Sequence, residues 1–258
     1  MTFAKRSLLV ILAAAPLLTG CASKPSVSAG AQARGLELGV LQPSEGHLSA
    51  ELLFSPDPIV ARYQRFTGSS SRPTARRAEM RVSPAGEGWE VQWWLLPTQP
   101  TGKPRFESSF TLRRGGDGSV LATQGFGEPG KQTIVFDPPV QLTPAVMQSG
   151  DRVTNEFLAR AIDDKGEQQG AGPSNSWTQY AGKQRIVTPM GTYDADVVLS
   201  GWNLSFGTGT IALQKRTWIA TIKPGRTTIV AQEIQQESSL LGWSGLAKTR
   251  YAIESLVR

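Results

Sequence analysis

The chain is poor in the side chains that most often carry catalysis and metal binding. Its 258 residues include one histidine, His47, and one cysteine, Cys21. A zinc site of the His/Cys type needs several such ligands, and a Ser/His/Asp or Cys/His mechanism needs a histidine beside a nucleophile. The residues around His47 resemble neither a nucleophile motif nor a metal motif. We therefore expect no metal, no cofactor and no catalytic residue, and we predict that the protein is not an enzyme.

Carboxylates remain as candidates for acid/base chemistry or for binding a hard cation. Asp194 and Asp196 lie two residues apart, so they would share one face of a strand. Asp163 and Asp164 fall in an expected loop. The same spacing is common on solvated surfaces. A hydrolase acting on envelope material is therefore kept only as a third hypothesis, with Asp194 and Asp196 as its residues.

Long hydrophobic runs are also missing. The apolar segment Leu8–Leu18 has 11 residues, and a helix needs about 20 to cross a bilayer. It follows Lys5 and Arg6 and contains Pro16. A short apolar core behind a positive start is typical of a secretory signal peptide.

The stretch Leu18-Thr19-Gly20-Cys21 ends this segment and resembles the lipobox of bacterial lipoproteins. The resemblance implies cleavage between Gly20 and Cys21, a diacylglycerol on the Cys21 thiol and acylation of its amine. Ala22, rather than Asp, follows the cysteine, and by resemblance to the sorting rule of enteric bacteria this favours the outer membrane. The expected location is the outer membrane of a Gram-negative bacterium, facing the periplasm. The alternative is an ordinary signal peptide that contains Cys21 by chance.

Net charge and composition narrow the classes of partner that the protein is expected to bind. Loss of residues 1–20 removes two basic residues and no acid, which lowers the formal net charge from +6 to +4. A mildly basic protein suits anionic envelope surfaces but carries no nucleic-acid signature. Residues 21–35 are small and polar, as in a flexible tether. We expect contact with the membrane through the lipid anchor, a lipid or an envelope protein as further partner, and no nucleic acid.

Residues 36–258 read as a β-rich envelope domain. Apolar and polar residues alternate in Ala78–Val82 and Trp89–Trp93, on either side of a glycine turn. Longer strands are expected later in the chain, up to the C-terminus. Two prolines at 138 and 139 should interrupt a sheet, so a break near 137–150 would allow two β halves. The predicted fold is an all-β antiparallel sandwich or open half-barrel, with little helix beyond the signal peptide.

A second, weaker resemblance covers about 40 residues. The segments Ile186–Ala195 and Lys215–Ala220 resemble the C-terminal half of β-rich envelope proteins, a group with half-barrel sheets such as those of the lipoprotein carrier LolA and the receptor LolB. The chain departs from the group's pattern at Thr221–Gly225. The resemblance implies a curved sheet, and it carries over neither a ligand nor a site.

Two sets of side chains are candidates for binding. Trp89, Trp93, Phe106 and Phe110 would line one surface if their strands are neighbours, either as ordinary core or as a concave ligand-binding face. Arg77 and Arg81 share a strand face with Glu79, and could contact anionic headgroups or simply be solvated. The leading hypothesis is a non-enzymatic outer-membrane lipoprotein that binds an apolar ligand or lipid on a curved β-sheet. The alternative is a structural or assembly lipoprotein that contacts other envelope proteins.

Overall fold

The computed structural model describes residues 36–42, 47–50, 58–128, 132–205, 209–240 and 243–257. Its described strands all lie in one compact unit, Ala33–Arg258. The signal peptide, the cleavage site at Gly20 and Cys21, and the tether over residues 21–35 lie outside the described residues, so these remain predictions. Within the described residues, no helix is long and apolar enough to cross a membrane.

The described strands run in chain order as follows: β1 (Glu37–Gln42), β2 (His47–Ser49), β3 (Ile59–Thr67), β4 (Ala78–Ala85), β5 (Gly88–Leu95), β6 (Arg105–Arg114), β7 (Val120–Glu128), β8 (Gln132–Thr143), β9 (Val146–Gln148), β10 (Arg152–Asp163), β11 (Gln168–Thr188), β12 (Gly191–Ser205), β13 (Gly209–Lys223), β14 (Arg226–Leu240) and β15 (Trp243–Leu256).

Twelve of these strands close into an antiparallel barrel. The hydrogen-bonded order β11-β10-β8-β7-β6-β5-β4-β3-β15-β14-β13-β12 returns to β11 through the β11–β12 ladder. β1 adds to β11 beyond the end of β10. The all-β antiparallel prediction is confirmed. The sandwich or open half-barrel is corrected to a closed barrel, because the β11–β12 ladder joins the two ends of the strand order.

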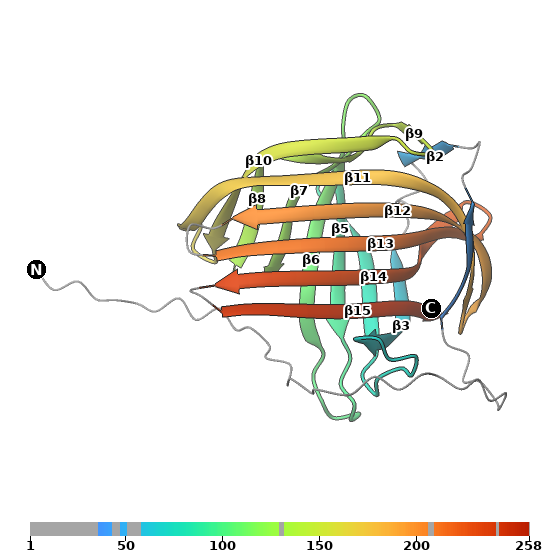
Figure 1. The fold of residues 1–258 in the computed structure, drawn as a ribbon. Coiled ribbons are helices and arrows are strands. Elements are labelled where there is room, and N and C mark those ends of the chain that lie inside the picture. Colours follow the sequence, from blue (N-terminus) through green and yellow to red (C-terminus); the bar gives the residue numbers. More distant parts are fainter. Residues whose placement is uncertain are drawn as a thin grey trace, which may run out of the picture. The chain divides into compact units, whose positions relative to one another are not determined.

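The barrel has two walls whose strands cross each other. β3 to β8 form one wall, and β10 to β15 run crosswise to them (Figure 1). Alternation decides which side chains enter the interior: on β5, Trp89, Val91, Trp93 and Leu95 are buried, and the residues between them are half-buried. A barrel of about eight strands is just wide enough to be filled by side chains. Twelve strands enclose more space, and large aromatic residues occupy much of it.

β8 continues through the two prolines at which a break was expected. The Asp137–Pro138 peptide is cis, and the ladder to β10 ends at Asp137. Beyond it, the Asn155 side-chain oxygen accepts the Gln141 N–H at 3.0 Å, and its amide donates to the Gln141 carbonyl at 2.9 Å. The side chain thus replaces the missing ladder. Strands before and after residues 137–150 belong to the same barrel.

A small second sheet closes one corner of the barrel. β2 pairs with β9, beside the start of β10 (Figure 1). Leu48 and Met147 from this pair are fully buried and pack with Tyr180, Val198 and Ile219. This corner is therefore sealed by apolar side chains.

Candidate functional site

Toward the opposite corner of the barrel, the side chains of the inner face become progressively more exposed. On β15, Tyr251 is 2% exposed, Thr249 is half-buried and Ala247 is exposed, and alternation places all three on the same face. β14 behaves likewise: Gln232 is buried, whereas Ile234 is half-buried. The inner side chains near this corner are therefore accessible to solvent.

The same trend appears on the opposing wall. On β6, Leu112 is buried, Phe110 and Ser108 are half-buried, and Glu107 is exposed. β3 pairs with β15 only from residue 249 onward, and the Gly68 N–H donates to the Lys248 carbonyl at 2.9 Å. Residues 243–247 of β15 therefore have no ladder partner on that edge among the described strands. We call this region the open corner and define it by its residues: Glu107, Ser108, Phe110, Lys215, Ile234 and Thr249.

An aromatic cluster forms the inner end of the open corner. The Trp202 ring lies 5.8, 5.4 and 5.9 Å from those of Phe110, Phe136 and Phe157, measured between centroids. These residues come from β12, β6, β8 and β10, so the contacts cross the interior. A Cβ on Gly125 would lie 2.8 Å from the Phe110 ring. Glycine at that position leaves room for the ring.

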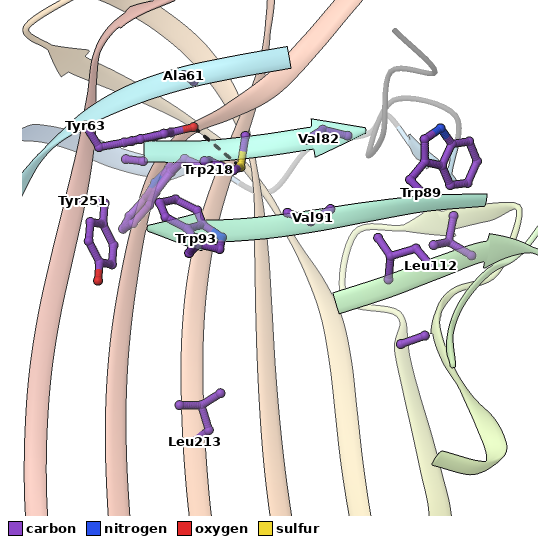
Figure 2. Packing of buried hydrophobic residues seen from close by; sticks show 14 of the residues in the cluster. Ala61, Tyr63, Val82, Trp89, Val91, Trp93, Leu112, Leu213, Trp218 and Tyr251 are labelled. Atoms are coloured by element: carbon purple, nitrogen blue, oxygen red, sulfur yellow. Dashed lines mark hydrogen bonds between the residues drawn. The ribbon is translucent and has the colours of Figure 1, made fainter. Parts of the chain in front are cut away.

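A second aromatic group lies beside this cluster, and the Tyr251 hydroxyl forms its polar end. Trp93 lies between Tyr63 and Tyr251, with centroid distances of 5.0 and 5.1 Å (Figure 2). The Tyr251 hydroxyl donates to Glu107 at 2.9 Å, and Arg65 also hydrogen-bonds this tyrosine. Burial, followed by the nearby Glu107 charge, raises the pKa of Tyr251. Both features keep this hydroxyl protonated as a donor.

Lys215 brings a positive charge to the inner wall. It pairs across the sheet with Ile234, and its ammonium lies 4.6 Å from the Phe110 ring centroid. Burial lowers the pKa of Lys215 from 10.5 to about 8. A charge held near a ring face is stabilised by a cation–π interaction, whereas burial disfavours the same charge and lowers its pKa.

The shifted pKa predicts a pH dependence of stability. Because the folded pKa lies below the unfolded one, the unfolded chain binds more protons between about pH 8 and 10.5, so this group's contribution to stability rises with pH in that window. The side chain is only half-buried by area, so we expect about 1–2 kcal/mol. Urea unfolding of the native chain and Lys215→Met at pH 7 and pH 9.5 measures it. The free energy of unfolding of the native chain should lie less far below that of Lys215→Met at pH 9.5 than at pH 7. A constant difference would contradict the prediction.

Three of the four predicted aromatic residues face the interior. Trp89, Trp93 and Phe110 belong to the core cluster or pack against it. Phe106 instead pairs with Trp94, which packs against it edge to face at 5.2 Å, on the outer surface. A bulge between Trp93 and Trp94 shifts the register by one residue and turns Phe106 outward.

The structure places Arg77 and Arg81 among partners on the outer surface. Arg81 contacts the buried Glu79 at 2.7 Å and lies over the Trp94 ring. Arg77 donates to Glu254 at 2.9 Å and to the carbonyl of Thr74. A headgroup at either arginine would compete with these intramolecular partners.

The remaining polar candidates are dispersed. His47 is exposed on β2, Asp194 is exposed on β12, and Asp196 accepts the Tyr180 hydroxyl at 2.8 Å. Asp163 caps a turn by accepting the N–H groups of Lys165 and Glu167, and these hydrogen bonds lower its pKa. Among the described residues, no three His, Cys, Asp or Glu side chains gather as a metal site would require.

Sequence reasoning did not single out Lys215, Ser108 or Thr249. Alternation along β13 was a usable signal, because Leu213, Lys215 and Thr217 share one face. A lysine between apolar or small inward residues is unusual for a strand that faces a filled core. The neighbours of Lys215 across the barrel, by contrast, depend on closure and could not be predicted.

Comparisons with known proteins assign no family. No protein-family model matches the chain, and no curated protein matches it. Among solved structures, the chain is similar to one described as a "putative lipoprotein" from Parabacteroides distasonis ATCC 8503, with a TM-score of 0.39 and 11% identity over 80% of this chain and 98% of that one. A likeness of this size leaves both the fold and the function of the chain to be argued from its own residues.

Proposed function

We propose that the protein is a lipid-anchored envelope lipoprotein, without catalytic activity, whose barrel holds an apolar or amphipathic small molecule through the open corner. The ligand site is the barrel interior, not the concave face of an open sheet. The anchor rests on the lipobox residues 18–21. The resemblance of Ala22 to the sorting rule supports the outer membrane, and the proposal places the domain on its periplasmic side.

One observation carries the binding proposal. The inner-face side chains of β6, β14 and β15 are more exposed toward one corner, whereas the other corner is sealed by Leu48 and Met147. A barrel that served only as a scaffold would gain stability by filling this space, because unfilled interior costs packing energy. Aromatic rings with a few polar groups at the entrance are typical of small-molecule sites.

Native mass spectrometry tests the proposal. We expect the chain from Ala22 onward, which keeps every described strand, to retain an amphipathic molecule from cells or to bind one added in solution. The complex should show one ligand mass per chain, and denaturation should release it. A spectrum that shows only the apoprotein, before and after addition of single-chain amphiphiles, would contradict the function.

The alternative function is assembly with another envelope protein, and β1 favours it. β1 is exposed throughout and lies at the end of the strand order. Its Leu38, Val40 and Leu41 are 42%, 80% and 40% exposed. Open strand edges pair readily with other chains. The same mass spectrum distinguishes the two functions, because assembly would add a protein mass instead of a small-molecule mass.

A further inference from the structure

We infer that the molecule held at the open corner has an anionic headgroup on an apolar chain. Its head would lie beside Lys215, and its chain would lie against Phe110 and the aromatic cluster. This inference rests on the proposed function and names the class of ligand.

The charges on the inner face near this corner are mostly positive. In the described parts of β3, β6, β13, β14 and β15, alternation and pairing place Arg65, Arg105 and Lys215 on the inner side, against one acid, Glu107. Glu107 already accepts the Tyr251 hydroxyl. Three cations facing one engaged carboxylate favour an anion and disfavour a cation.

Arg65 supplies a further sign of a missing acceptor. Its Nε is buried and has no hydrogen-bond partner among the described residues, although the side chain also reaches Tyr251. A buried donor without an acceptor costs free energy. Arg65 lies three strands away from Lys215 in the register, so it adds positive charge to this part of the inner face rather than a second contact to the same head.

The sheet register orders the polar and apolar parts of the site. Lys215, Ile234 and Thr249 form one row across β13, β14 and β15, and Thr217, Gln232, Tyr251 and Arg65 form the next row. Ser108 and Thr249 add hydroxyl groups from the two walls. The Phe110 ring, next to the Lys215 ammonium, leads from this polar rim to Trp202.

Lys215 is suited to pair with the head. A carboxylate loses its hydration when it enters an apolar interior, and a paired cation offsets that cost. The lysine itself is destabilised in its charged form by burial, so an incoming anion would favour the charged form. A neutral head would leave the lysine without this gain.

Calorimetric titration at pH 7 tests the inference with four probes that share a ten-carbon chain: decanoate, decyl phosphate, decanol and decyltrimethylammonium. With the chain from Ala22 onward, we expect at least one of the two anions to bind about tenfold or more tightly than decanol, and the cation to bind weakest. Lys215→Met should reduce anion affinity to that of decanol, whereas Lys215→Arg should keep the preference. Lys248→Met is the matched control, because Lys248 lies on the outer face and pairs with Glu233 at 2.6 Å.

The outcomes separate this inference from the function on which it rests. Equal affinity for decanol and both anions would overturn the anionic head while leaving a barrel that binds amphiphiles. A preference that persists in Lys215→Met would overturn the role of Lys215. If none of the four probes binds, the proposed function fails as well. A preference for decanoate or for decyl phosphate supports the inference and identifies the head as carboxylate or phosphate.

Discussion

Replacing Trp202 by alanine is expected to lower the free energy of unfolding by about 3–5 kcal/mol. Trp202 is 3% exposed, and its ring contacts three phenylalanine rings from three other strands. Truncation would remove these contacts and leave a cavity where the two walls of the barrel meet. Urea unfolding, followed by circular dichroism, measures the loss.

Trp94→Ala is the control for this prediction. Trp94 is half-buried on the outer face of β5, against Phe106 and Arg81, so the same change should cost about 1–2 kcal/mol. Losses of equal size in the two variants would show that Trp202 does not join the walls as the structure describes.

The strands themselves could be predicted from sequence because alternation is a local property. On β5 the pattern Trp89, Val91, Trp93 reads directly as a buried face, and the structure buries all three. Long alternating runs likewise predict β13 and β14. The order of the strands is not local. Tyr63 pairs with Ile253, which lies 190 residues later in the chain, and no feature of either residue indicates the other.

Closure and bulges account for the differences between prediction and structure. A single register shift after Trp93 moves Phe106 to the outer face, and the sequence there shows no glycine or proline to mark it. The Pro138–Pro139 pair predicts a broken sheet, but Asn155 replaces the lost ladder from a neighbouring strand. Both effects depend on a partner strand that the local pattern does not specify.

The candidate site, too, could be predicted only where it depends on the local pattern of a single strand. Phe110 and Trp93 could be chosen from their own strands, while the open corner depends on how far β3 extends along β15. The importance of Lys215 likewise depends on Phe110, which approaches from the other wall. Sites formed between walls are therefore visible in sequence only as unusual inward residues.

The open corner can be blocked by one side chain. Ser108 lies opposite Trp93 on the inner face, and Ser109 lies opposite Gln92 on the outer face. Both serines are half-buried. Ser108→Trp would place an indole in the space beside Phe110, whereas Ser109→Trp adds the same volume outside the barrel. We expect binding of decanoate or decyl phosphate to weaken by about 30-fold or more in the first variant and to stay within about twofold in the second.

The measurement is the calorimetric affinity of the two variants for these anions, compared side by side with the native chain. Circular dichroism of both variants shows that the barrel is intact. Loss of binding in Ser108→Trp, with native affinity in Ser109→Trp, is the predicted result. Native affinity in a folded Ser108→Trp, or equal loss in both variants, would contradict a ligand site inside the barrel at the open corner.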